Sequence, residues 1–319
     1  MHLARVLAAI SSIVLLVPGV DVVSGQDFPN KTIRIIGGAA GGGSDFAARL
    51  IAQGISGPLG QQVIMDNRTV IQAVEAVSKA LPAGYTLLVG GNSIWIPPLL
   101  QKVPYDMERD FAPLVLISRD INVLAVHPSL PAKSVKELIA LAIARPGELN
   151  YGSGSSGSLS HLAVELFKHM GGVDIVRVPY KGTGPAIIAM LSGEIQLLIV
   201  DTGLLLPHAK SGKLRALAVT SMESSALAPG LPTVAAAGLP GYEAVGMTGM
   251  FAPAKTPAAV ISRLNQEMVR FLRLPDVKEK FFNIGAEISA STPEQFGLAV
   301  KSDTGRMGKV IKDAGIKVD

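Results

Sequence analysis

The chain has 319 residues, of which 48% are hydrophobic, 17% are charged and 5% are aromatic, and its formal net charge is +4. This hydrophobic content excludes a disordered protein and is sufficient for two domains with their own cores. The cationic residues are scattered singly and few aromatic residues are present to stack on bases, so the composition argues against nucleic-acid binding and suits an acidic small molecule. The absence of cysteine excludes disulfides, thiolate nucleophiles and zinc–sulfur sites.

Residues 1–25 have the pattern of a signal peptide. A single cationic side chain lies in Met1–Arg5, a largely apolar run covers Val6–Val17, and small residues precede Gln26. The apolar run is too short to span a bilayer comfortably, and an uncleaved anchor is the alternative interpretation. We therefore expect export of the chain, with cleavage after Gly25.

Short β-branched runs then alternate with helical segments. Strands are predicted at Ile33–Ile36, Gln62–Asp66, Tyr85–Gly90, Leu114–Ser118, Val123–His127, Asp174–Val178, Ile195–Val200 and Ala216–Thr220. Helices are predicted at Phe46–Ser56, Val70–Ala80, Val135–Arg145, Leu159–His169, Pro185–Ser192, Leu204–Ser211, Ala258–Leu272, Pro275–Ile284 and Pro293–Ala314. This alternation predicts an α/β fold with mixed, mostly parallel sheets and helices on both faces.

The weaker alternation after Thr220 indicates how the chain divides. Residues 229–257 are rich in glycine and proline and are interpreted as an extended crossing segment. We expect residues 26–122 and 221–319 to form domain 1, with residues 123–220 inserted as domain 2 and a hinge near residues 122–126 and 220–224. Ligands of such sheets bind at the carboxyl ends of the strands, where two glycine-rich loops lie.

The first of these loops leads into the helix predicted at Phe46. Its candidate ligand-binding residues are Ala39, Ala40, Gly41, Gly42, Gly43, Ser44 and Asp45. The loop lacks the G-x-G-x-x-G spacing and the lysine of a nucleotide-binding loop. We interpret it as a nest of backbone N–H groups for a carboxylate, with Ser44 and Asp45 capping the helix. A tight turn without a ligand is the alternative.

The second loop runs from Asn150 into the helix predicted at Leu159. Its candidate ligand-binding residues are Ser153, Ser155, Ser156, Gly157 and Ser158, with His161 in the first helical turn. Hydroxyl and N–H groups at a helix start favour an anion, although Ser158 or Ser160 as a simple N-cap is the alternative. The esterase motif G-x-S-x-G is absent, which argues against nucleophilic catalysis.

Four further residues follow predicted strands and are included as candidate ligand contacts: Asn92, Tyr180, Thr183 and Asp201. Asp201 either orients a ligand hydroxyl or amine or caps the next helix. His161, Glu165 and His169 are spaced to share one helix face. That spacing is compatible with a metal site, but a solvated face or a loop network is the simpler interpretation. We expect no metal and no cofactor.

Several stretches, in this order and spacing, resemble the substrate-binding proteins of tripartite tricarboxylate transporters, the Bug-type family. They are Gly41–Asp45, Ala48-Arg49, Asp66–Arg68, Gly84–Leu88, Pro104–Asp106, Asp110–Pro113, Pro146–Tyr151, His161–Phe167, Val178–Gly182, Leu231–Val234 and Val310–Lys317. The resemblance covers nearly all of residues 28–319. It implies a periplasmic, two-domain clamshell of the type II periplasmic-binding-protein-like class, without catalytic residues. Such a protein passes a small organic acid to the membrane subunits of a transporter, and we expect a monomer.

The chain departs from the family pattern at three places. The family loop corresponding to residues 37–45 carries three prolines that are absent here, which raises the cost of ordering this loop on binding. The glycine-rich segment that follows Arg68 in the family is shortened. Met247 and Met307 stand where the family tends to have tryptophan.

Two other functions use the same features. A ligand-sensing component of a signalling system would have the same clamshell. A secreted hydrolase would use Ser156 or Ser158 as the nucleophile with His161 as the base.

Overall fold

The structure is a computed structural model that describes residues 28–317, so the predicted signal peptide lies outside the described residues. The strands are β1 (Ile33–Gly37), β2 (Val63–Asn67), β3 (Thr86–Gly91), β4 (Phe111–Asp120), β5 (Asn122–Val126), β6 (Asn150–Ser153), β7 (Val176–Pro179), β8 (Leu197–Asp201), β9 (Arg215–Val219), β10 (Gly246–Pro253) and β11 (Ala286–Ile288). The helices are α1 (Gly43–Leu59), α2 (Val70–Ser78), α3 (Asn92–Trp95), α4 (Pro97–Leu100), α5 (Met107–Asp110), α6 (Val135–Ala144), α7 (Leu159–Gly171), α8 (Thr183–Leu191), α9 (Thr202–Lys210), α10 (Val234–Ala237), α11 (Ala258–Leu272), α12 (Pro275–Asn283) and α13 (Pro293–Asp313). None of these helices is long and apolar enough to cross a membrane.

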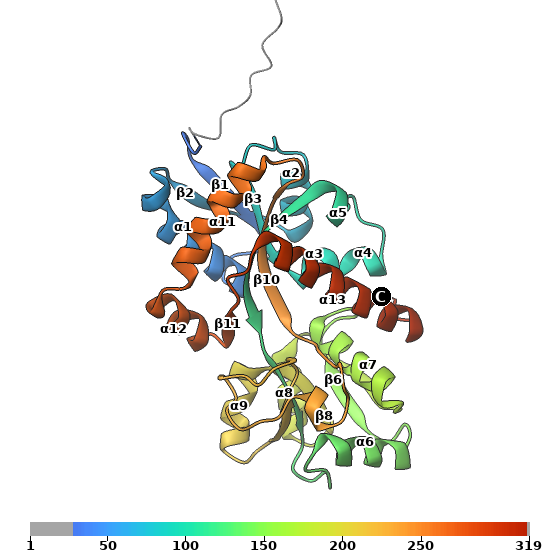
Figure 1. Cartoon of the computed structure of the whole chain (residues 1–319). Helices are drawn as coiled ribbons and strands as arrows, with labels where there is room; N and C mark the ends of the chain where they lie inside the picture. Colours follow the sequence, from blue (N-terminus) through green and yellow to red (C-terminus); the bar gives the residue numbers. More distant parts are fainter. Residues whose placement is uncertain (1–27, 318–319) are drawn as a thin grey trace, which may run out of the picture.

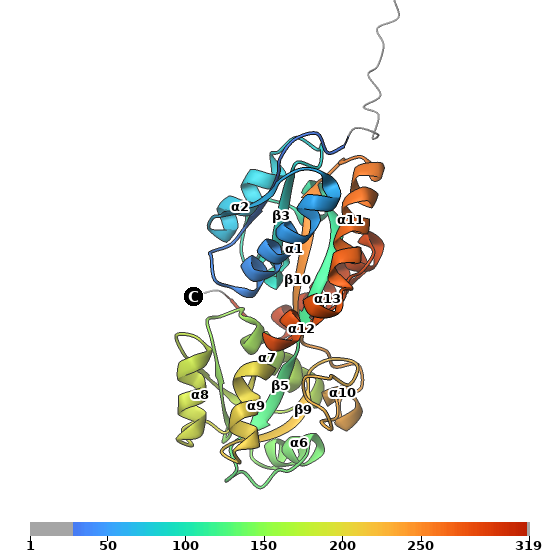
Figure 2. The same ribbon diagram turned by 90° about the vertical axis from the view of Figure 1, so that its left-hand side faces the viewer.

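The strands form two separate sheets, which lie one above the other in Figures 1 and 2. We call them sheet A, with the strand order β11-β4-β10-β3-β1-β2, and sheet B, with the order β7-β6-β8-β5-β9. The chain passes from sheet A to sheet B between β4 and β5, and it returns between β9 and β10. The middle of the chain therefore builds sheet B, and both ends build sheet A.

Helices cover both faces of sheet A, as predicted. Alternate residues of β1 point to opposite faces. Ile33 and Ile35 join the buried cluster that contains α1 and α11, whereas Ile36 joins the cluster that contains α2 and Phe296 of α13. Each face of the sheet thus has its own apolar layer.

The expectation that the sheets are mostly parallel is wrong. Both sheets are mixed, and five of the nine strand pairings within residues 28–317 are antiparallel. The antiparallel pairings of β10 and β5 arise where the chain crosses between the two sheets. Strand β10 re-enters sheet A antiparallel to both of its neighbours, β3 and β4, and β5 enters sheet B antiparallel to β8 and β9.

Strand β10 also corrects the prediction for residues 229–257. This segment contains a fully buried strand in the interior of sheet A, between β3 and β4. Its glycines are required by packing: a Cβ atom at Gly249 would lie 2.1 Å from Cζ of Phe296, and one at Gly246 would lie 2.8 Å from Oδ2 of Asp120. Glycine here marks close approach of neighbouring side chains.

Helix α1 is longer at both ends than predicted. It begins at Gly43 instead of Phe46, and it continues through Pro58 to Leu59. Gly60 ends it with a left-handed φ of 64°, a conformation that glycine adopts without steric cost. The earlier start places Ser44 and Asp45 inside the first helical turn.

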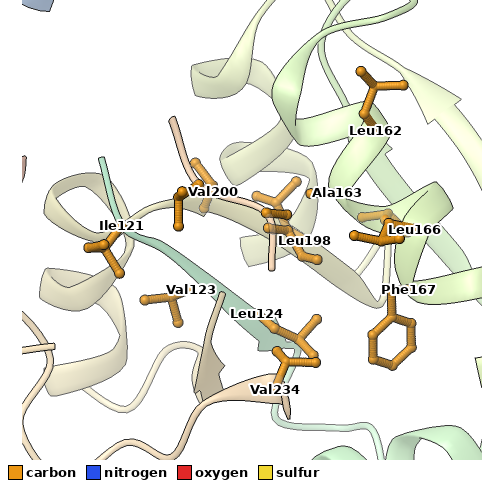
Figure 3. Close-up of a cluster of buried hydrophobic side chains, with 14 of the residues drawn as sticks. Ile121, Val123, Leu124, Leu162, Ala163, Leu166, Phe167, Leu198, Val200 and Val234 are labelled. Carbon is orange, nitrogen blue, oxygen red and sulfur yellow. The ribbon is translucent and has the colours of Figure 1, made fainter. Parts of the chain in front are cut away.

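The core of the sheet B unit is shown in Figure 3. Apolar side chains of α7 pack beside strands β5 and β8, with a contribution from α10; the labelled residues are Ile121, Val123, Leu124, Leu162, Ala163, Leu166, Phe167, Leu198, Val200 and Val234. The hydroxyl group of Tyr242 donates a hydrogen bond of 2.8 Å to the carbonyl oxygen of Ala163. This hydrogen bond links α7 to the segment of the chain that returns to sheet A.

Candidate functional site

A cavity of about 460 Å³ lies where the two sheet units meet. Its lining comes from both units: Ser44, Gly91, Asn92, Ser93, Ile96, Pro97, Leu100, Gln101, Asp120, Ser155, Ser156, Gly157, Ser158, Leu159, Leu162, Gly246, Met247, Thr248 and Met307. A volume of this size is typical of small-molecule sites. We call this space the central cavity.

The loop before α1 contributes Ser44 to the central cavity. Ala39, Gly42, Gly43, Ser44 and Asp45 line an adjoining cavity of about 140 Å³, whereas Ala40 and Gly41 are exposed and line neither. The prediction that Ser44 and Asp45 cap the helix is wrong. The N-cap residue is Gly42, which has no side chain, and the N–H groups of the first turn are left for another partner.

Asp45 holds this loop in shape. Its carboxylate accepts hydrogen bonds from the Gly41 N–H (3.0 Å), Arg49 Nε (3.0 Å) and Asn67 Nδ2 (2.8 Å). Burial acts to raise the pKa of this carboxyl group, but these hydrogen bonds and the Arg49 charge outweigh burial and lower it. Asp45 is therefore an ionised positioning residue whose oxygens are directed to its own loop.

The loop between β6 and α7 lines the opposite side of the central cavity through Ser155, Ser156, Gly157 and Ser158. Ser158 is the N-cap of α7, and its hydroxyl oxygen accepts a hydrogen bond of 3.4 Å from the His161 N–H. The N-cap interpretation of Ser158 is therefore confirmed, and its place in the cavity lining leaves ligand contact as a prediction.

Arg177 on β7 supports this loop from behind and was not found by sequence reasoning. Its guanidinium donates hydrogen bonds to Ser153 Oγ (2.8 Å), Ser156 Oγ (2.9 Å) and the carbonyl oxygen of Gly154 (2.9 Å). Ser153 is fully buried and does not line the cavity. The only sequence signal was an arginine inside the strand predicted at Asp174–Val178. Arg177 adds positive charge beneath the candidate anion site.

His161 is buried and also supports the loop. Its Nδ1 accepts a hydrogen bond of 3.0 Å from the Gly157 N–H, and it does not line the central cavity. Glu165 on the next turn accepts hydrogen bonds from Tyr151 (2.5 Å) and Lys168 (2.9 Å), and His169 pairs with Asp313 on α13. The three residues thus have separate partners. No cluster of three metal-binding side chains occurs between residues 28 and 317.

The remaining candidates fall in two groups. Asn92 lines the central cavity, and its side chain accepts a hydrogen bond from the Met247 N–H (2.8 Å) and donates one to Asp303 (2.8 Å). Tyr180, Thr183 and Asp201 do not line the cavity. The Tyr180 hydroxyl donates to Glu194, Thr183 is the first residue of α8, and Asp201 caps α9 by accepting from the Gly203 N–H (2.8 Å).

Two methionines and an acid complete the cavity. Met247 and Met307 both line it and supply flexible apolar surface that adapts to ligand shape. Asp120, at the end of β4, was not predicted and lines it as well.

Comparison with known proteins agrees with this geometry. Residues 47–316 match the family model described as the tripartite tricarboxylate transporter family receptor. Protein BugT of Bordetella pertussis is 32% identical over 325 residues, covering 100% of both chains.

Two solved structures show the same fold. The structure of R. palustris Rpa4515 with adipate is 37% identical, covers 91% of this chain and 99% of that one, and has a TM-score of 0.71. The structure of the periplasmic binding protein BugD is 28% identical, covers 91% and 99% of the two chains, and has a TM-score of 0.68. These matches confirm the predicted α/β class of the type II periplasmic-binding-protein-like proteins. The chain belongs to the tripartite tricarboxylate transporter receptor family and is a solute-binding protein, not an enzyme.

Proposed function

We propose that the protein captures a small organic carboxylate in the central cavity and delivers it to the membrane subunits of a tripartite tricarboxylate transporter. The observation that carries this proposal is that two helix N-termini meet at one cavity. Ser44 in the first turn of α1 and Ser158 at the N-cap of α7 both line it. Unpaired N–H groups and the helix dipole favour an anion at such positions.

The strength of binding follows from a small number of contacts. A hydrogen bond to a charged group contributes about 1.5–3 kcal/mol. A micromolar complex needs about −8 kcal/mol. A few hydrogen bonds from the two loops, with the Arg177 charge behind one of them and burial against Met247 and Met307, supply this without a metal.

The two chain crossings support a hinge. We propose residues 26–122 and 221–319 as one domain and residues 123–220 as the other, with bending near residues 122–126 and 220–224. Only Ile121 separates β4 in sheet A from β5 in sheet B. A carboxylate bound to both α1 and α7 would favour the closed arrangement of the two domains.

The proposed cellular location is supported by the N-terminal sequence and by a relative. We propose that residues 1–25 are a signal peptide cleaved after Gly25 and that the mature protein acts as a monomer in the periplasm. BugD, a periplasmic binding protein, supports this location. Mass determination of the protein recovered from the periplasm tests the cleavage site.

The test of the function is ligand binding by protein freed of bound ligand, prepared by unfolding in urea, dialysis and refolding. Thermal unfolding is measured with a panel of mono-, di- and tricarboxylates. A ligand at 100 times its dissociation constant stabilises the native state by about 2.7 kcal/mol. If no carboxylate raises the unfolding temperature, the proposal is wrong.

A pair of serine variants tests the place of binding. Ser44→Asp puts a carboxylate into the first turn of α1, where the helix tolerates it, but the new charge repels an anionic ligand in the cavity. Ser134→Asp makes the same change at the N-cap of α6, remote from the cavity. We expect Ser44→Asp to lose carboxylate binding and Ser134→Asp to keep it.

A further inference from the structure

Asp120 is a carboxylate in a cavity that otherwise suits an anion. It is the last residue of β4, it is paired in register with Gly246 of β10, and it lies at the crossing between the two sheets. A Cβ atom at Gly246 would come within 2.8 Å of Asp120 Oδ2, so the side chain lies over the Gly246 backbone. Both residues line the central cavity.

The carboxylate of Asp120 has no partner within the described chain. No hydrogen bond or ion pair reaches it from residues 28–317. Arg119, the preceding residue of β4, pairs with Glu243 at 3.0 Å and not with Asp120. A partly buried carboxylate without a partner is destabilising. A ligand group that donates a hydrogen bond to Asp120 would therefore be favourable at this position.

The nearest electrostatic influence on Asp120 is of the same sign. Burial, followed by repulsion from Asp201, raises the pKa of Asp120 to about 6. Asp201 is stabilised by the N–H groups at the start of α9, so it does not need a partner from the cavity. At neutral pH Asp120 is therefore mainly ionised. Of the two carboxylates, Asp120 is the one that lacks a hydrogen-bond donor among residues 28–317.

We propose that Asp120 selects, among small carboxylates, those that also carry a hydrogen-bond donor, with an ammonium group preferred to a hydroxyl group and a second carboxylate disfavoured. This inference rests on the proposed function. The serine-lined loops and helix N-termini receive the ligand carboxylate, and Asp120 accepts from the donor group. Accordingly, this chain differs in preference from its relative that was solved with adipate.

Matched ligands isolate the donor group. For skeletons of three to six carbons, each set contains the unsubstituted monocarboxylate, its hydroxy and amino derivatives, and the dicarboxylate, with the substituent at carbon 2 or at the chain end. Dissociation constants are measured by calorimetry at pH 7.5 on refolded, ligand-free protein. We expect the amino derivative of the best skeleton to bind at least tenfold more tightly than its unsubstituted and dicarboxylate counterparts.

Two charge-matched variants assign this preference to Asp120. Asp120→Asn keeps the size of the side chain and should abolish the preference for the amino derivative while improving dicarboxylate binding. Asp174→Asn removes an exposed carboxylate outside the cavity and should leave both affinities as in the unmodified protein.

The outcomes are distinct. A dicarboxylate that binds the unmodified protein as tightly as the amino derivative, or an amino preference that survives in Asp120→Asn, overturns the inference. If dicarboxylate binding weakens in Asp120→Asn, then Asp120 assists the second carboxylate instead of disfavouring it, and the inference is also wrong. If no carboxylate binds at all, it is the proposed function that fails.

Discussion

Replacing Arg177 with methionine tests whether its guanidinium holds the loop between β6 and α7 in a binding form. Methionine keeps an unbranched apolar stem but removes the donors to Ser153 Oγ, Ser156 Oγ and the Gly154 carbonyl. Each hydrogen bond from a charged donor contributes about 1.5–3 kcal/mol. Ser153 is 0% exposed and cannot take a water molecule in place of the guanidinium, whereas Ser156 lines the cavity and can.

We therefore expect Arg177→Met to lower the free energy of unfolding by about 2–4 kcal/mol, less than the sum of three bonds, because Arg177 is only half-buried and water compensates part of the loss. Urea unfolding of ligand-free protein measures this change. Calorimetry with the carboxylate that gives the largest thermal shift should show binding at least tenfold weaker, because the loop loses both its shape and the charge beneath it.

Arg145→Met is the matched control. Arg145 is an exposed residue at the end of α6, in the part of the chain that builds sheet B, and its replacement removes the same charge. Arg177→Lys should fall between the two, because an ammonium group cannot span three separated acceptors as the guanidinium does. The reasoning is refuted if Arg177→Met and Arg145→Met agree within about 0.5 kcal/mol, the usual range for surface substitutions, and bind the carboxylate equally well.

Three further predictions follow from particular contacts. Because the pKa of Asp120 is raised from 3.8 to about 6, the unmodified protein should lose up to about 3 kcal/mol of stability relative to Asp120→Asn as the pH rises from 4 to 7. Urea unfolding of both proteins across this range measures the difference in their free energies of unfolding, and a difference that does not change with pH would contradict the prediction. Gly249→Ala should cost at least about 1–3 kcal/mol, because its Cβ atom would overlap the buried ring of Phe296, and an unchanged unfolding midpoint would show that the ring moves freely. Ser158→Ala should cost about 1 kcal/mol through loss of the cap to the His161 N–H, whereas Ser158→Asp should recover stability but weaken carboxylate binding in the same calorimetric assay.

Local patterns in the sequence determined most of the helices and strands. The prediction of α11 at Ala258–Leu272 agrees with the structure at both ends, because its apolar spacing and the preceding Pro257 act within a few turns. The two glycine-rich loops were also found from sequence, since a strand followed by glycine, serine and a helix is a local motif. The order of motifs along the chain was sufficient to indicate the family.

Tertiary structure alone decided which residues share the central cavity and how the sheets are paired. Strand β10 was missed because its glycines are unfavourable for a strand by local preference, and only packing against Phe296 and Asp120 explains them. Arg177 meets the loop at Ser153 through parallel pairing of β6 and β7, a contact that local patterns do not encode. Asp120 lines the cavity without a hydrogen-bond or ion-pair partner among residues 28–317, and its position beside Gly246 comes from the pairing of β4 with β10. Contacts between distant segments therefore set the chemistry of the cavity, whereas the sequence by itself determined the elements that carry it.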